Sequence, residues 1–518
     1  MRLRILIVIA LALVLFFSYL GATSLWDPDE PRQAIMAREM MQRGDYVHPY
    51  LNGQPYLEKP PFYPWMIVAA AKIGGALNEF ASRAPSAIAA TLLIFVVFFL
   101  GRMLVGVQCG FLSALVLATN YQYLSNARES VMDMTFAFFI GLTIFLNYVA
   151  SAKDRRFFFA LSFLPASIAI LTKGPAGLVI PAGVAFVYLL TEGKWKRFII
   201  PLIGGCLLSA AVASIWFFAA GEAYIREFIL HQNITRYANA FDHRESFFYY
   251  FHKLFFNFLP WSMFLPFALV HAWKKKYWLP LIWFVLTFLF FEFSQSKRAI
   301  YLLSLYPASA LICGLFLKDA WVGLVDGVGT NRTLKALAAF LVLLPACAMI
   351  MIPSMRGSDV IDVVRSGPKS LYAYLGLLSA TGALFFAMLV KRSGRLALGM
   401  FIVYLVVAGY FYNAWYMPLV DKSTKSLKLI TDELAPYKNT KEFYTLGFNS
   451  AGIIFYLGKP VHIGVDIDEI KQSKDDILLI VEDKSSARLN EKIAEAFQPI
   501  QRVKYEREYY TFYVRKHG

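Results

Sequence analysis

Charged residues are scarce in this chain of 518 residues: they make up 17% of it, whereas 58% are hydrophobic and 16% are aromatic. A soluble domain usually carries about 25% charged residues, so the shortage excludes an ordinary soluble protein. Apolar runs of about 18 to 22 residues recur along most of the length, and as helices they can cross a hydrocarbon core of about 30 Å. We therefore predict a polytopic α-helical membrane protein.

Cysteine is also rare, and its placement excludes a cysteine-based metal or redox site. Each of the four lies alone in an apolar stretch, which indicates small core residues: Cys109, Cys206, Cys313 and Cys347. The formal charge of +16 does not indicate a nucleic-acid groove, because Lys and Arg form short clusters between the apolar runs. Such clusters set membrane topology and contact anionic lipid headgroups.

The apolar runs predict about thirteen transmembrane helices. We place them at 4–22, 84–105, 109–122, 131–151, 157–171, 176–191, 198–219, 255–272, 278–293, 300–317, 336–353, 371–390 and 396–417. Cytoplasmic loops are rich in Lys and Arg. The basic clusters near residues 2–4, 153–156, 194–197, 274–276 and 391–395 all fall on one side in this arrangement. We therefore expect a cytoplasmic N-terminus, carried by an uncleaved first helix rather than a signal peptide.

The long loops 23–83 and 220–254 then face outward, as does the C-terminal segment. In the first loop, residues 27–43 carry apolar side chains at helical spacing, which predicts a helix lying along the membrane interface. A second apolar stretch at 65–75 follows several prolines and is too short to span the membrane. Two interfacial helices are therefore expected in this loop.

Beyond Pro418 the composition changes, because acidic and basic residues become almost equal in number. The pattern predicts strands at 442–448, 452–457, 476–482 and 502–515 and helices at 423–436 and 485–497. The sequence thus predicts a transmembrane domain over 1–420 and a small outward-facing α/β domain over 421–518.

Carboxylates cluster directly after the first span. Asp29 and Glu30 lie where a carboxylate can position or deprotonate an acceptor, although capping of the following helix is an alternative role. Asp27 is the better cap, because a proline follows it at once. Asp133 lies inside the apolar pattern of a span, where an ionisable group is costly and is therefore often functional.

Cations lie on the same outer face. Lys59 follows Glu58 and precedes a double proline that fixes its direction, so Lys59 can hold a phosphate; a solvated charge pair is the alternative. Arg128 bounds one span and Lys173 interrupts two others. Their alternative roles are an interface anchor and a snorkelling lysine in a tight turn.

The second long loop and a later outer turn add further polar groups. They contain His231, Arg236, Lys297, Arg298 and Tyr301. An anionic lipid phosphate is the natural partner of such a set. His231 can also pair with Glu58 on a metal, but one histidine and one glutamate make a weak metal motif.

Several motifs together resemble a known family, the polytopic C-type glycosyltransferases that use polyprenyl-phosphate sugars. The similarity is greatest to bacterial 4-amino-4-deoxy-L-arabinose transferases that modify lipid A, within the wider protein mannosyltransferase group. The motifs are Asp29-Glu30-Pro31-Arg32, Arg38-Glu39-Met40 to Gly44-Asp45, Leu51-Asn52-Gly53 to Glu58-Lys59-Pro60-Pro61, Arg83-x-Pro85-Ser86, Leu171-Thr172-Lys173-Gly174-Pro175 and Tyr301-Leu302-Leu303 to Pro307.

The resemblance implies roles for most of these residues. It makes Asp29 the main catalytic carboxylate, with Asp133 as a second acidic residue near it and Glu30 as a neighbouring candidate. It assigns the donor phosphate to Lys59, Arg236 and Tyr301. Further candidate substrate contacts are Arg128, Lys173, Lys297 and Arg298. No cofactor is required, although Glu58 and His231 are candidates to share a divalent metal such as zinc.

The implied reaction moves a sugar from polyprenyl (undecaprenyl) phosphate, with inversion, to lipid A or another glycan or protein of the cell envelope. It takes place at the outer face of a bacterial inner membrane. A transporter or flippase of a lipid-linked sugar is the alternative, because many spans and intramembrane charges are also typical of transporters. The charged residues gather in outer loops rather than at mid-membrane, which favours the transferase. A non-catalytic assembly protein that binds a partner through its C-terminal domain is a third hypothesis.

Overall fold

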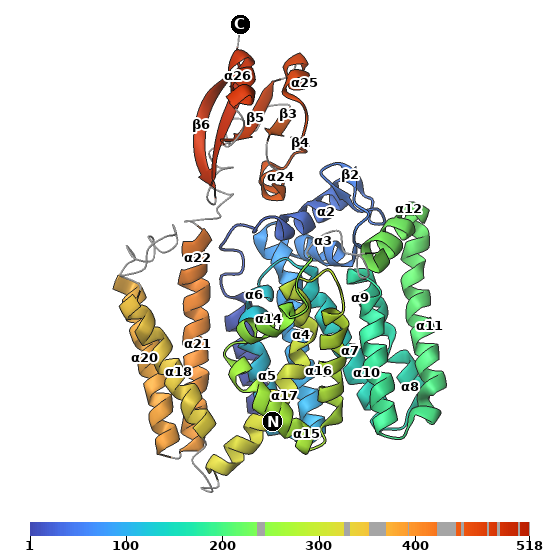
Figure 1. The fold of residues 1–518 in the computed structure, drawn as a ribbon, viewed down its shortest axis with the longest axis vertical. Coiled ribbons are helices and arrows are strands. Elements are labelled where there is room, and N and C mark those ends of the chain that lie inside the picture. Colours follow the sequence, from blue (N-terminus) through green and yellow to red (C-terminus); the bar gives the residue numbers. More distant parts are fainter. Residues whose placement is uncertain are drawn as a thin grey trace.

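The computed structural model describes residues 1–235, 244–325, 332–351, 369–391, 393–421, 442–446, 450–473, 476–483, 487–505 and 508–516. Helices dominate up to residue 421, and a small sheet follows (Figure 1). The N-terminus lies at the end of the helical part that is remote from this sheet (Figure 1).

Within the described residues, six helical segments are long and apolar enough to cross a membrane by length and composition. They are Glu79–Val105, Met132–Ala152, Arg156–Lys173, Trp195–Ala220, Leu371–Val390 and Gly399–Val420. Shorter apolar helices lie at Val107–Ala118, Ala176–Thr191, Trp278–Glu292 and Leu337–Met349. In Figure 1 the long helices run roughly side by side.

The helices of the first half follow the predicted spans closely. They are α1 (Arg2–Ala12) with η1 (Leu13–Phe17), α4 (Glu79–Val105), α5 (Val107–Ala118), α6 (Tyr121–Asn126), α7 (Met132–Ala152), α8 (Arg156–Leu161), α9 (Leu164–Lys173), α10 (Ala176–Thr191), α11 (Trp195–Ala220), α12 (Glu222–Ile225) and η2 (Arg226–Thr235). The predicted span 157–171 is divided, because α8 ends at Leu161 and α9 begins at Leu164 with a proline in its first turn.

The second half contains one clear departure from the prediction. Its helices are α14 (Tyr249–Asn257), η3 (Trp261–Met263), α15 (Leu265–Lys274), α16 (Trp278–Glu292), η4 (Ala299–Ser304), α17 (Tyr306–Val325), α18 (Arg332–Met351), α20 (Lys369–Val390), α21 (Gly394–Phe411), η6 (Tyr412–Tyr416) and α22 (Met417–Val420). The continuous span predicted at 255–272 is wrong. Pro260 has no N–H to donate and breaks the segment into α14, η3 and α15.

The first outer loop folds into α2 (Asp29–Arg43) and α3 (Phe62–Gly74), with a short hairpin of β1 (Tyr50–Leu51) and β2 (Gln54–Pro55) between them. This confirms both predicted short helices. The capping role predicted for Asp27 is wrong, because Pro28 occupies the N-cap position and makes no side-chain cap. The Asp27 carboxylate instead accepts a hydrogen bond of 3.1 Å from the Gly452 N–H. The helix α2 ends at Gly44, whose φ of 68° suits glycine.

The C-terminal α/β region, which we define as the described residues from 442 to 516, has a five-stranded sheet in the order β4-β3-β5-β7-β6. Its elements are β3 (Glu442–Leu446), α24 (Ala451–Leu457), β4 (His462–Ile463), α25 (Ile467–Gln472), β5 (Ile477–Glu482), α26 (Ala487–Ala496), β6 (Phe497–Tyr505) and β7 (Glu508–Arg515). Strand β3 is parallel to β4 and β5, whereas β7 is antiparallel to β5 and β6. One face of the sheet packs with α24, and the other with α25 and α26.

The predictions for this region have mixed outcomes. The strand predicted at 452–457 is wrong, because Ser450 caps the start of α24 and Gly458, with φ of 73°, ends it. The run 502–515 is a hairpin rather than one strand. The helix predicted at 423–436 lies outside the described residues. The boundary between domains at residue 420 stays a prediction.

Two of the four cysteines lie in the apolar core of the helical part. Cys109 and Cys313 are buried among apolar side chains, as predicted, whereas Cys206 is half-buried and Cys347 is exposed. All four are free thiols.

Candidate active site

A cavity of about 380 Å³ opens where α7, α9, α10, η2, α16 and η4 meet. Aromatic and aliphatic side chains form much of its wall, including Phe136, Phe290 and Phe291. The polar lining consists of Lys59, Lys173, Gln232, Asn233, Ser294, Ser296 and Tyr301. Three residues predicted from the sequence, Lys59, Lys173 and Tyr301, therefore line one cavity. A mostly apolar pocket with a few convergent polar groups is typical of a small-molecule site.

Two of these residues connect the cavity to a carboxylate. Lys173 ends α9 and forms an ion pair with Asp133, which lies in the first turn of α7. The Lys173 Nζ also lies 4.0 Å from the centre of the Tyr301 ring. Both charged side chains are less than one-fifth exposed. The pair explains how the membrane part tolerates Asp133, because a buried charge is stable only with a partner.

Asp29 occupies the first turn of α2 and faces Arg298. The Asp29 Oδ2 and Arg298 Nη2 atoms are 2.5 Å apart, and Arg32 lies at 4.0 Å from Asp29. Burial lowers the pKa of Arg298, but the carboxylates of Asp29 and Asp133 outweigh it and raise that pKa. Asp29, Asp133, Arg298 and Tyr301 therefore belong to one electrostatic cluster. The Asp29 side chain is 37% exposed, so it is open to a substrate.

The backbone of Lys59 is fixed by a contact with η2's neighbouring helix α12. Its carbonyl accepts a hydrogen bond from the Tyr224 hydroxyl, and its Nζ lies 5.8 Å from the centre of the Phe228 ring. The neighbouring Glu58 is exposed and accepts a hydrogen bond of 3.3 Å from the Tyr56 hydroxyl. Burial, with help from Glu58, raises the pKa of Tyr56, so this phenol stays protonated at neutral pH. Lys59 thus lines the cavity, whereas the neighbouring Glu58 stays exposed.

The metal prediction gains no support from these contacts. His231 Nδ1 lies 3.0 Å from Glu227 Oε1 on the same turn of η2. In the part of the chain that the structure describes, no group of three or more His, Cys, Asp or Glu side chains is placed to hold a metal ion. Glu58 and His231 alone do not make a zinc site, which needs at least three protein ligands.

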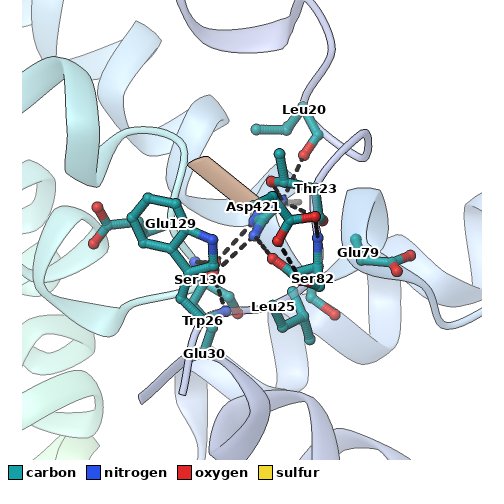
Figure 2. A network of polar contacts seen from close by, with 12 residues as sticks. Leu20, Thr23, Leu25, Trp26, Glu30, Glu79, Ser82, Glu129, Ser130 and Asp421 are labelled. Carbon is teal, nitrogen blue, oxygen red and sulfur yellow. Dashed lines mark hydrogen bonds and ion pairs between the residues drawn. The ribbon is translucent and has the colours of Figure 1, made fainter. Parts of the chain in front are cut away.

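Other predicted residues have different outcomes. Arg236 lies outside the described residues, so its phosphate contact stays a prediction. Glu30 is buried, and both of its oxygens accept hydrogen bonds of 2.8 Å from the Arg83 guanidinium. Figure 2 shows Glu30 in the surrounding network of polar contacts, close to Trp26 and Ser130. The backbone N–H groups of Trp26 and Ser130 also donate to Glu30. These contacts give Glu30 a structural position and do not support the catalytic role predicted for it.

Arg128 and Lys297 are buried in the same manner. Arg128 donates to the backbone carbonyls of Phe16 and Ser18. The Lys297 Nζ lies 3.3 Å from the Glu292 carboxylate, and both side chains are less than 5% exposed. The substrate contacts predicted for Arg128 and Lys297 are therefore not supported, whereas the neighbouring Arg298 reaches Asp29.

Sequence reasoning missed several groups of the cavity wall. Ser294 and Ser296 lie in the outer turn that also carries Lys297, Arg298 and Tyr301, and Phe136 lies one helical turn after Asp133. Gln232 and Asn233 follow His231 in η2, but nothing in their spacing indicates a role. Serine and amide side chains are common in loops, so the sequence contains no signal that separates these from others.

A substitution at Gly174 tests whether the position of Asn233 in the cavity wall matters for activity. Its φ is +117°, and a Cβ built on it would lie 2.7 Å from Asn233 Oδ1 and 2.9 Å from Phe228 Cζ. We expect Gly174→Ala to push Asn233 out of place and to lower activity at this site about tenfold or more, since misplacement by about 1 Å can cost 10²-fold. The matched control is Gly106→Ala between α4 and α5, where φ is +120° but nothing lies within 4 Å of the added Cβ. Equal steady-state activity of both variants would contradict this geometry.

Comparisons with known proteins agree with the predicted resemblance. Residues 58–217 match the family model described as dolichyl-phosphate-mannose-protein mannosyltransferase. An uncharacterized protein of Aquifex aeolicus is 33% identical over 324 residues, which cover 61% of this chain and 64% of that protein. A second relative, from Proteus mirabilis, is named undecaprenyl phosphate-alpha-4-amino-4-deoxy-L-arabinose arabinosyl transferase 2. It is 29% identical over 328 residues, which cover 60% of this chain and 59% of that protein. The matches thus span less than two thirds of these relatives.

The fold is shared over almost the whole length. The crystal structure of ArnT from Cupriavidus metallidurans bound to undecaprenyl phosphate superposes with a TM-score of 0.76 and 21% identity, covering 98% of this chain and 97% of that one. The apo form of the same protein gives 0.77 and 22%. The predicted resemblance and the polytopic helical fold with a small C-terminal α/β region are confirmed. The chain is a multi-pass membrane protein.

Proposed function

We propose that this chain is a membrane glycosyltransferase that moves a sugar from a polyprenyl phosphate to an acceptor of the bacterial cell envelope. The observation that carries the proposal is the cavity itself, where two lysines and a tyrosine meet beside two ion-paired carboxylates. An apolar wall with a cationic end suits a lipid phosphate. Relatives named as undecaprenyl phosphate aminoarabinose transferases support undecaprenyl phosphate as the carrier and aminoarabinose as the sugar. The proposed acceptor is lipid A.

In this reaction the bond between the anomeric carbon and the phosphate oxygen breaks, and its electron pair stays on the phosphate. Lys59 and Lys173 stabilise this negative leaving group, and Tyr301 lies against Lys173 and orients it. An oxygen of the acceptor attacks the anomeric carbon from the opposite face, which inverts its configuration. The phosphate leaves as undecaprenyl phosphate.

The role of Asp29 depends on the acceptor. A hydroxyl acceptor must lose its proton, and in this proposal Asp29, which is 37% exposed, takes it as a general base. A phosphate acceptor, with a second pKa of about 6, is largely ionised at neutral pH and needs no base. In that case Asp29, fixed by Arg298, stabilises the positive charge that develops on the sugar.

The proposal includes an orientation in the bacterial inner membrane. The N-terminus lies in the cytoplasm, because the basic clusters flank the helix ends on that side. Loop 23–83, the cavity and the C-terminal α/β region then face the periplasm. A cysteine-labelling experiment in intact cells tests this: in a variant whose four native cysteines are replaced by serine, a cysteine replacing exposed Ile463 should react with an impermeant reagent.

Lys59→Ala tests the donor site. We expect the KM for an undecaprenyl-phosphate aminoarabinose donor to rise about 10- to 100-fold, because a hydrogen bond to a charged group contributes about 1.5–3 kcal/mol. The assay follows transfer to lipid A by purified protein in liposomes, detected by mass spectrometry. The control is Lys72→Ala, since Lys72 lies in the same loop but contacts the Tyr46 hydroxyl at 3.2 Å. An unchanged KM for Lys59→Ala would remove Lys59 from the donor site.

A further inference from the structure

The C-terminal α/β region contacts the loop that carries Asp29. Helix α24 lies directly over α2 in Figure 1. Ile35 of α2 is fully buried in the same apolar cluster as Phe443, Ile454 and Phe512 of the C-terminal region. A residue of the membrane loop thus completes a core that belongs to the sheet.

Both ends of α24 are bound by polar groups of the outer loop. At its start, the Gly452 N–H donates to Asp27 Oδ1 at 3.1 Å. At its end, Arg38 of α2 donates to the carbonyls of Phe455 and Ile454 at 2.8 and 3.1 Å. The first N–H groups and last carbonyls of a helix have no partners inside the helix, so these contacts satisfy groups that would otherwise need water.

Two further contacts hold the region on the loop. The Asn52 side chain makes a reciprocal pair with the Val461 backbone, donating to its carbonyl at 2.7 Å and accepting from its N–H at 2.8 Å. The Tyr456 hydroxyl accepts a hydrogen bond of 2.7 Å from the Leu25 N–H and donates to Glu79 at 3.2 Å. The interface is therefore specific in register and not merely apolar.

The loop residues that make these contacts lie on both sides of Asp29 in the sequence. Leu25 and Asp27 precede it by four and two residues, and Arg38 lies on the same helix. The donor cations of the cavity instead come from the loop before α3 and from the end of α9. The C-terminal region thus holds the segment that carries the acidic group, whereas the membrane helices hold the groups for the donor phosphate.

We propose that the C-terminal α/β region is a positioning element of the active site, which fixes the start of α2 so that Asp29 stands against Arg298. Asp27, Arg38 and Tyr456 are positioning residues, because they act on Asp29 through α2. This inference rests on the proposed function. It implies that weakening the interface lowers kcat, because Asp29 acts after the donor has bound, and leaves the donor KM nearly unchanged.

The test compares full-length variants with the wild type. Asp27→Ala removes the acceptor of the Gly452 N–H, whereas Asp27→Asn keeps an oxygen in the same place. Tyr456→Phe keeps the ring and removes the hydroxyl that accepts from Leu25. The control is Arg502→Ala in the same region, where Arg502 binds Asp483 at 2.6 Å on an exposed strand. The assay measures kcat, KM for the undecaprenyl-phosphate aminoarabinose donor, and the thermal midpoint in detergent.

We expect Asp27→Ala and Tyr456→Phe to lower kcat about 10- to 100-fold with KM changed less than about twofold, as for a small displacement of a catalytic group. Asp27→Asn and Arg502→Ala should retain wild-type kcat. Should Asp27→Ala fail to fold, Tyr456→Phe decides alone. Wild-type kcat in Tyr456→Phe, or an equal loss in Asp27→Asn, would overturn the inference. An inactive wild type would instead refute the proposed function.

Discussion

Asp29→Asn is expected to lower the kcat of sugar transfer about a thousand-fold, within the range of about 10²–10⁴ for loss of a general base. The substitution keeps the size of the side chain and its ability to accept a hydrogen bond from Arg298, but it removes the negative charge. Both roles proposed for Asp29 require that charge. The donor KM should change little, because Asp29 contacts Arg298, whereas the donor cations Lys59 and Lys173 line the cavity.

The stability of the Asp29→Asn protein should stay close to that of the wild type. The pair of Asp29 and Arg298 is more than one-third exposed, and exposed pairs contribute at most about 1 kcal/mol. The matched control is Asp154→Asn, because Asp154 makes a similarly exposed pair with Arg197 in a loop remote from the cavity. Transfer by Asp29→Asn at the rate of Asp154→Asn would exclude Asp29 from catalysis.

Arg83→Ala is expected to destabilise the fold by about 3–5 kcal/mol, the usual cost of leaving a buried charge without its partner. Arg83 is 4% exposed and binds Glu30 through two hydrogen bonds of 2.8 Å. It also donates to the carbonyls of Leu20, Thr23 and Ser24, so it holds the chain between the first helix and α2. Arg83→Lys should rescue little, because an ammonium cannot form this two-pronged arrangement.

The measurement is equilibrium unfolding of purified variants in the same detergent. Arg197→Ala serves as the control, because its pair with Asp154 is about half exposed. The double variant Arg83→Ala/Glu30→Ala should be less destabilised than the sum of the single changes, since removing both charges leaves none unpaired. Equal stability of Arg83→Ala and Arg197→Ala would show that the buried pair is not a structural anchor.

Helices that rest on long apolar runs or on regular apolar spacing could be predicted from the sequence. The apolar runs located the long helices, and the apolar spacing and prolines of the first loop located α2 and α3. Where the prediction failed, a local signal outweighed the average pattern. Pro260 broke one span, and the cap at Ser450 with Gly458 turned an apparent strand into α24. Both signals are short, and their effect depends on the packing around them.

At the candidate site, sequence reasoning could not separate the roles of neighbouring charged residues. Asp29 and Glu30 are neighbours in the first turn of α2, so their side chains point about 100° apart. Asp29 faces Arg298 and Glu30 faces Arg83, partners that lie 269 and 53 residues further along the chain. Lys297 and Arg298 differ in the same way. Sequence reasoning could identify the charged segments, but only the tertiary fold decides which neighbour is buried in a structural pair and which stays open to a substrate.

The most direct test of covalent transfer from a polyprenyl phosphate measures both products at once. Purified protein in liposomes receives undecaprenyl-phosphate aminoarabinose and lipid A, and mass spectrometry follows free undecaprenyl phosphate and modified lipid A. Our account predicts equal molar amounts of the two products with the wild type and neither with Asp29→Asn. Movement of the intact donor across the bilayer without either product would contradict it and indicate a transporter.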